Sequence, residues 1–172
     1  VWIRGKKMKY IYVGKIVNTH GIKGEIRILS DFLKKDLVFK KNFILYIGPS
    51  KEKEIIKTYR KHKEFDMVTL EGINNINEVL KYKGCNVYIN REDLKIADNN
   101  YILEDLIDFE IKENEKTLGK LKDFMYNNGN ILLIIEGQKK FYIPYNDYYI
   151  KKVDLKNKIV YTENAKDLIL WR

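Results

Sequence analysis

Short runs of Ile, Val, Tyr and Phe recur along this chain in alternation with polar residues. Turn-forming residues separate the runs at intervals of about eight to twelve residues, which is the spacing of β-sandwiches and small β-barrels. Signals for helices are scarce by comparison. The sequence therefore predicts an all-β fold with one or two short helices.

The first half of the chain contains six such runs. We expect strands at residues 10–17, 25–30, 43–47, 54–62, 66–71 and 86–89. Six short strands suit a small closed barrel, because closure removes exposed sheet edges. The main helix signal lies at residues 75–82, where Asn74 or Asn75 can cap the first turn, and a weaker one lies near residues 33–39.

Residues 91–100 interrupt the alternation with Glu, Asp, Lys and Asn, which is typical of a linker. Beyond them we expect strands at residues 105–112, 117–125, 131–136, 140–144, 149–154 and 158–162. The sequence thus predicts a second small barrel. We place the two domains at residues 8–91 and 98–172.

The segment from Gly14 to Arg27 has the pattern of a strand, a glycine-rich loop and a second strand. Gly21 and Gly24 can adopt positive φ without a steric penalty, so the chain can turn tightly there. Such a turn would gather His20, Lys23 and Arg27 around one spot that suits a phosphate group. The alternative is an ordinary hairpin whose His and Lys side chains are merely solvated.

The charge of the chain is divided unevenly between its halves. Residues 1–92 contain 20 Lys+Arg against 10 Asp+Glu, a balance of +10, whereas residues 93–172 contain 13 against 14, a balance of −1. Lysines can simply keep a surface soluble, but an excess confined to one half favours a domain that faces a polyanion.

The sequence offers few residues for catalysis. His20 and His62 are the only histidines, no nucleophile-elbow or P-loop motif is present, and no His, Cys or carboxylate set has the spacing of metal ligands. Cys85 is the only cysteine, which excludes an intrachain disulfide and suggests a cytoplasmic protein. No apolar run approaches the roughly 18 residues of a membrane span. We therefore predict a protein that is not an enzyme, with no catalytic residues, no cofactor and no metal.

Several short motifs occur in a characteristic order along the chain. They are the His20-Gly21-Ile22-Lys23-Gly24 loop, Glu71-Gly72-Ile73 before a short helix, Tyr101-Ile102-Leu103-Glu104-Asp105-Leu106, Leu118-Gly119-Lys120 and Ile143-Pro144-Tyr145. In this order and spacing they resemble the RimM family of ribosome maturation factors, and the resemblance covers nearly the whole chain.

The resemblance implies a six-stranded N-terminal barrel of the translation-factor type followed by a PRC barrel. It further implies that the protein assists assembly of the head of the small (30S) ribosomal subunit and 16S rRNA processing. The implied partners are the free 30S subunit, small-subunit ribosomal protein nineteen and nearby 16S rRNA. We expect a monomer without a membrane partner. The charge division agrees, because a basic barrel suits rRNA and a neutral one suits a basic protein.

The family motifs also nominate contact residues. The rRNA-facing residues would be His20, Gly21, Lys23, Gly24 and Arg27. The residues that bind the ribosomal protein would be Tyr101, Leu103, Asp105, Leu106 and Tyr145. The two leucines could instead belong to the core. The family usually has two adjacent tyrosines before this second motif, and here Asn100 occupies the first position, which removes one aromatic anchor.

A second function remains open from the sequence. The chain could be a general RNA-binding module of the translation-factor type, without a dedicated ribosomal protein partner. Binding of a ribosomal protein by residues 98–172 would separate the two hypotheses.

Overall fold

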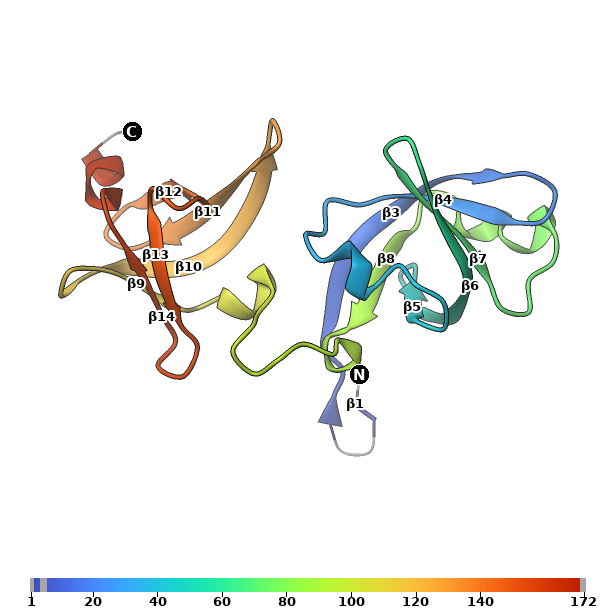
Figure 1. Ribbon diagram of the computed structural model, residues 1–172, viewed down its shortest axis with the longest axis horizontal. Helices are drawn as coiled ribbons and strands as arrows, with labels where there is room; N and C mark the ends of the chain where they lie inside the picture. Colours follow the sequence, from blue (N-terminus) through green and yellow to red (C-terminus); the bar gives the residue numbers. More distant parts are fainter. Residues whose placement is uncertain (1, 4–5, 171–172) are drawn as a thin grey trace. The chain divides into compact units, whose positions relative to one another are not determined.

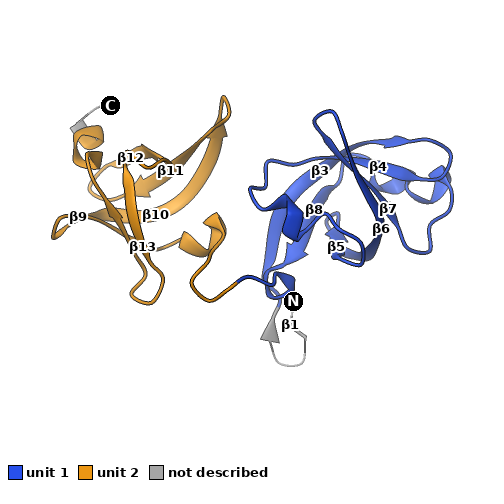
Figure 2. Ribbon diagram, in the orientation of Figure 1, with its two compact units in different colours: residues 1–96 blue, residues 97–172 orange. Residues whose placement is uncertain are grey.

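The computed structural model of the protein describes residues 2–3 and 6–170. The chain forms two compact units, Val1–Ile96 and Ala97–Arg172, which Figure 2 shows in different colours. Each unit is built almost entirely of β-strands, so the predicted all-β fold is confirmed.

The first unit contains a closed antiparallel barrel with the strand order β3-β4-β7-β6-β5-β8 (Figure 1). Its strands are β3 (Tyr10–His20), β4 (Glu25–Leu29), β5 (Ile44–Ile47), β6 (Glu52–His62), β7 (Phe65–Leu70) and β8 (Asn86–Asn90). All six overlap the strands expected from the sequence. A short ladder of β1 (Trp2–Ile3) and β2 (Lys6–Lys7) precedes them.

Alternation of apolar and polar residues fills this barrel. On β4, Ile26 and Ile28 point inward and are fully buried, whereas Glu25 and Arg27 point outward and remain partly exposed. The other strands contribute inward residues in the same way. Fully buried side chains of this interior include Ile16, Leu45, Ile56, Val68, Leu70, Val87 and Ile89.

Short 3-10 turns replace the helices expected in the first unit. They are η1 (Lys35–Leu37), η2 (Ile76–Glu78) and η3 (Leu80–Tyr82), and a further turn, η4 (Arg91–Asp93), begins the segment expected to be a linker. The side chain of Asn75 accepts hydrogen bonds from the backbone N–H groups of Asn77 and Glu78, so the predicted cap is confirmed. The expected helix over residues 75–82 is divided at Val79, which has φ −107° and ψ −6° and, as a β-branched residue, is a weak helix former.

The second unit is a six-stranded sheet with the order β12-β11-β10-β9-β14-β13. Its strands are β9 (Glu110–Glu113), β10 (Lys116–Asn127), β11 (Asn130–Glu136), β12 (Lys140–Pro144), β13 (Ile150–Asp154) and β14 (Ile159–Thr162). Strands β9 and β14 pair in parallel and the other neighbours are antiparallel. Within the described residues the edges β12 and β13 are not joined by a ladder.

The prediction of a strand over residues 105–112 was wrong for residues 105–109. Residues Leu103–Leu106 form the 3-10 turn η5, and β9 begins only at Glu110. The carboxylate of Asp105 accepts the backbone N–H of Ile102 at 3.0 Å and so caps this turn. A last turn, η6 (Ala165–Leu170), was not expected and packs against β12. The buried carboxylate of Glu113 accepts the N–H of Ala165 at 2.7 Å at the start of η6.

Candidate functional site

Backbone contacts connect the loop between β3 and β4 to the segment around Asn75. Gly21 and Gly24 have φ of +71° and +86°, a region that only glycine enters without strain. A Cβ atom on Gly24 would lie 2.8 Å from the carbonyl oxygen of Asn75, whereas one on Gly21 would meet no atom within 4 Å. Glycine is therefore required at position 24 for two reasons, the positive φ and the close approach of residues 73–75.

A hydrogen bond ties the tip of this loop to the first residue of η2. The N–H of Ile76 donates to the carbonyl oxygen of Ile22 at 3.0 Å. The Ile22 side chain is nevertheless 82% exposed, and the neighbouring side chains of His20 and Lys23 are also exposed. The loop thus presents an imidazole, an ammonium group and an apolar side chain from a fixed backbone.

Arg27 lies on the outer face of β4, two residues after the start of the strand that follows this loop. Its Nη2 donates to Nδ1 of His20 at 3.0 Å, and its guanidinium lies 5.6 Å from the centroid of the Phe65 ring. Because a guanidinium can only donate, this contact leaves the proton of a neutral His20 on Nε2. The Nε atom of Arg27 is buried and has no hydrogen-bond partner among the described residues. The structure therefore brings His20 and Arg27 together, and Arg27 also packs against the barrel.

A second arginine lies on the same outer face but is already paired. Arg60 on β6 donates two hydrogen bonds to the carboxylate of Glu25, at 2.9 and 2.7 Å. The hydrogen bond from Arg60 is the main reason that the pKa of Glu25 falls below its usual value. Arg27 and Arg60 pair with the same residue of β7, Met67, from opposite sides. Sequence reasoning missed Arg60, although the run from Lys57 to Lys63 signals a basic hairpin.

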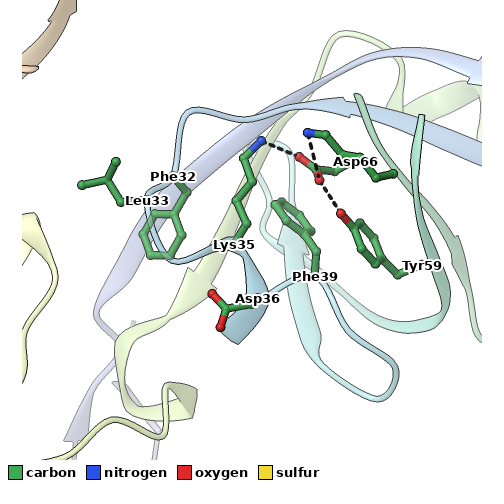
Figure 3. Close-up of a pocket in the computed structure, with 8 residues that line it drawn as sticks. Phe32, Leu33, Lys35, Asp36, Phe39, Tyr59 and Asp66 are labelled. Atoms are coloured by element: carbon green, nitrogen blue, oxygen red, sulfur yellow. Dashed lines mark hydrogen bonds and ion pairs between the residues drawn. The ribbon is translucent and has the colours of Figure 1, made fainter. Parts of the chain in front are cut away.

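A pocket of about 530 Å³ lies beside η1 in the first unit (Figure 3). Its lining residues are Phe32, Leu33, Lys35, Asp36, Phe39, Tyr59, Lys61 and Asp66. Asp66 is fully buried, and its carboxylate accepts the Tyr59 hydroxyl at 2.7 Å and the Lys35 ammonium at 2.8 Å. The Lys61 ammonium lies 3.7 Å from the same carboxylate. The rings of Phe39 and Tyr59 stack with centroids 6.1 Å apart.

The polar groups of this pocket bind one another and stabilise the fold. The carboxylate of Asp66 already has three cationic or hydroxyl partners, so it has little capacity left for a ligand. Burial, together with the hydrogen bond to Asp66, raises the pKa of Tyr59 to about 12. The part of the chain that the structure describes contains no group of three His, Cys, Asp or Glu side chains that could hold a metal ion. None of its helical segments is long and apolar enough to cross a lipid bilayer.

In the second unit, the predicted contact residues Tyr101 and Tyr145 meet. Their hydroxyl groups are 2.8 Å apart, although the two residues are far apart in the sequence. Burial, with a smaller contribution from this hydrogen bond, raises the pKa of Tyr145 above its usual value. The two rings line a pocket of about 340 Å³ whose other walls are Asn146, Asp147, Ile150, Lys151, Lys152 and Val153. The side chain of Asn100 turns back to accept the N–H of Tyr101 at 2.9 Å.

The remaining predicted contact residues lie elsewhere. Leu103 and Leu106 are 5% and 0% exposed and belong to the hydrophobic core of the second unit. A partner has no access to them in this conformation, which agrees with the core alternative. Asp105 is partly exposed but serves the cap of η5. Of the five predicted residues, only Tyr101 and Tyr145 therefore line the pocket.

Comparison with known proteins covers both units. The sequence matches the RimM N-terminal domain at residues 11–94 and the RimM PRC barrel domain at residues 103–168. It is 36% identical over 155 residues to the ribosome maturation factor RimM of Staphylococcus haemolyticus (strain JCSC1435), covering 87% of this chain and 93% of the relative. It is 35% identical over 153 residues to ribosome maturation factor RimM of Staphylococcus aureus (strain NCTC 8325 / PS 47), covering 86% and 92%. The solution structure of the N-terminal domain of RimM from Thermus thermophilus aligns with a TM-score of 0.44 and 19% identity, over 52% of this chain and 98% of that one.

Proposed function

This chain belongs to the RimM family of ribosome maturation factors, and on that premise we propose that it assists assembly of the 30S subunit head and 16S rRNA processing. It does so as a cytoplasmic, monomeric, non-enzymatic protein that binds free 30S subunits and uses no cofactor. The observation that carries the proposal is the match of both units, in order, to the two domains of the family.

The first barrel contacts 16S rRNA, mainly through phosphate groups. This is supported by the exposed His20 and Lys23 on the β3–β4 loop and by Arg27, which contacts His20. Phosphate contacts release counterions, so affinity for RNA should fall steeply with salt. If four to six phosphates are engaged, the slope of log affinity against log salt should be roughly −3 to −5. A flat response would contradict an electrostatic interface.

Lys23→Glu is the sharpest test of this loop, because Lys23 is exposed whereas Arg27 is partly buried against Phe65. The variant should bind rRNA more weakly and keep the melting temperature of the wild type, because exposed substitutions usually change stability by about 0.5 kcal/mol or less. Lys41→Glu is the matched control. Lys41 is exposed and lies just before β5. Strands β3 and β5 run in the same direction, because both are antiparallel to β8. The start of β5 is therefore at the opposite end of the barrel from the loop that follows β3. Equal losses in both variants would point to net charge alone.

The second barrel binds small-subunit ribosomal protein nineteen through Tyr101, supported by Tyr145. Tyrosine offers a large apolar area and a polar tip, which is why it is frequent at interface hot spots. Tyr101→Ala should weaken binding by roughly 2 kcal/mol or more, about thirtyfold, in a titration of the full chain against the ribosomal protein. Tyr101→Phe removes only the hydroxyl that meets Tyr145, and Asn100→Tyr should tighten binding by restoring a ring. Unchanged affinity in a folded Tyr101→Ala protein would place the contact elsewhere.

Sedimentation of cell extract tests the function as a whole. The protein should travel with free small subunits and be absent from translating ribosomes. Binding to many RNAs without enrichment on free 30S subunits would instead favour a general RNA-binding module.

A further inference from the structure

Four tyrosines form a cluster on the outer face of the first barrel. Tyr12 on β3 pairs with Tyr88 on β8, and Tyr88 pairs in turn with Tyr46 on β5, so the three form one row across neighbouring strands. Tyr10 lies beside this row. The ring centroids of Tyr12 and Tyr88 are 6.0 Å apart, those of Tyr10 and Tyr46 are 5.3 Å apart, and the rings meet edge to face.

The tyrosine row does not point into the barrel interior. The residues that alternate with the tyrosines, Ile11 and Val13 on β3 and Val87 and Ile89 on β8, point inward and are at most 4% exposed. The tyrosines thus lie on the outer face of the barrel, but Tyr46 is only 9% exposed and Tyr88 is partly buried. Tyr12 is 52% exposed, which leaves much of its ring available to a partner.

Lysines accompany the tyrosine row. The Lys51 ammonium lies 4.3 Å from the centroid of the Tyr88 ring. Lys53 on β6 continues the row, because it pairs with Tyr46. Lys15 follows Tyr12 along β3 as the next exposed residue. Aromatic rings are therefore bordered by three positive charges.

Two carboxylates lie near the same surface. Burial raises the pKa of both Tyr12 and Tyr46. The negative charge of Asp31 adds to this effect at Tyr12, and that of Asp93 adds to it at Tyr46. Both carboxylates disfavour phosphate groups in their immediate surroundings. A polyanion on this face would therefore place its backbone along the lysines and its uncharged groups over the rings.

We propose that Tyr12, with the partly exposed ring of Tyr88 beside it and with Lys15, Lys51 and Lys53, is a stacking surface for the bases of a single-stranded stretch of RNA. Tyr46 is 9% exposed and supports these rings from below. Proteins that bind single strands combine aromatic side chains, on which bases stack, with cations that follow the phosphates. A double helix cannot use such a surface, because its bases are already stacked and paired. The surface is separate from the phosphate-binding loop at residues 20–24. This inference rests on the proposed function in that the natural ligand would be 16S rRNA.

The test uses the full chain and two labelled probes, a ten-nucleotide oligouridylate and an RNA duplex, with binding followed by fluorescence anisotropy. Tyr12→Ala should weaken binding of the single strand by about 5- to 100-fold, which is the usual effect of losing one stacking ring. Its affinity for the duplex should not change. Tyr12→Phe keeps the ring and should bind both probes as the wild type does. Tyr142→Ala is the matched control, because Tyr142 is a 44% exposed tyrosine of the second unit.

Lys51→Gln provides a second variant that does not depend on the Tyr12 position. It should weaken single-strand binding and make it less sensitive to salt, because one phosphate contact is lost. Wild-type affinity of a folded Tyr12→Ala protein for the single strand, or an equal loss for both probes, would overturn the stacking surface. If Lys23→Glu still weakens binding of both probes, the proposed rRNA contact stands without it. Failure of the wild type to bind any RNA would instead contradict the proposed function of the first barrel.

Discussion

The close contact between the β3–β4 loop and Asn75 makes a pair of glycine substitutions informative. Gly21 and Gly24 both have positive φ, so replacing either with Ala introduces the same kind of backbone strain. Only at Gly24 would the added Cβ lie within 2.8 Å of a backbone carbonyl oxygen, that of Asn75. Gly21→Ala is thus a matched control for Gly24→Ala.

The expected magnitudes follow from these contacts. A non-glycine residue in the left-handed region costs roughly 1–2 kcal/mol, which is the whole expected effect of Gly21→Ala. In Gly24→Ala the loop and Asn75 must also separate. This weakens the hydrogen bond from Ile76 to Ile22, at about 1 kcal/mol, and disturbs the cap by Asn75, at about another 1 kcal/mol. Gly24→Ala should therefore cost about 3–4 kcal/mol.

Differential scanning calorimetry of the full chain measures the difference. With roughly 4–8 °C per kcal/mol for a domain of this size, the transition of the first unit should lie about 10 °C lower in Gly24→Ala than in Gly21→Ala. Gly24→Ala should also bind rRNA more weakly than Gly21→Ala at a temperature where both are folded, because the loop that carries Lys23 is displaced. Equal melting temperatures would refute the reasoning from the contact with Asn75.

Two further predictions concern the pocket around Asp66. Asp66→Asn should destabilise the first unit by about 2–3 kcal/mol in denaturant unfolding, because the Tyr59 hydroxyl and the Lys35 ammonium lose a buried charged acceptor. Asp36→Asn is the control, because Asp36 lines the same pocket but is exposed, and it should change stability by about 0.5 kcal/mol or less. The pKa of Tyr59 is raised from 10.0 to about 12, so the unfolded chain releases this proton first and stability should fall as the pH rises through that interval. The fall should be shallower in Tyr59→Phe, and identical alkaline unfolding curves would contradict the raised pKa that burial and the hydrogen bond to Asp66 give Tyr59.

The strands of the first barrel could be predicted because they depend on local alternation. Ile26 and Ile28 are separated by an outward Arg27, and this period of two is visible without any knowledge of the neighbouring strands. The turn η5 could not be recognised in the same way. Its inward residues Leu103 and Leu106 are three positions apart, and an apolar run with such spacing fits a short strand and a 3-10 turn equally well.

The candidate sites depend on strand register, which the sequence does not specify. Tyr101 and Tyr145 were each nominated by a family motif, but their hydrogen bond requires the turn before η5 to lie beside the end of β12. The tyrosine row was missed for the same reason. Tyr12, Tyr46 and Tyr88 belong to three strands, and they become neighbours only because β8 pairs with both β3 and β5.

The ion pairs within the first unit decide how much of its positive charge is available to RNA. Arg60 is already neutralised by Glu25, and Lys35 by the buried Asp66, so these cations release few counterions when RNA binds. Lys23 differs, because it forms no ion pair within the described part of the chain. The salt dependence of rRNA binding should therefore come from the unpaired lysines that touch phosphates, and four to six such contacts give the expected slope of roughly −3 to −5. Glu25→Gln tests whether the paired Arg60 takes part, because it removes the carboxylate that holds Arg60. If Arg60 does not reach the RNA, the slope in Glu25→Gln should equal that of the wild type, and a steeper slope in the variant would contradict this reasoning.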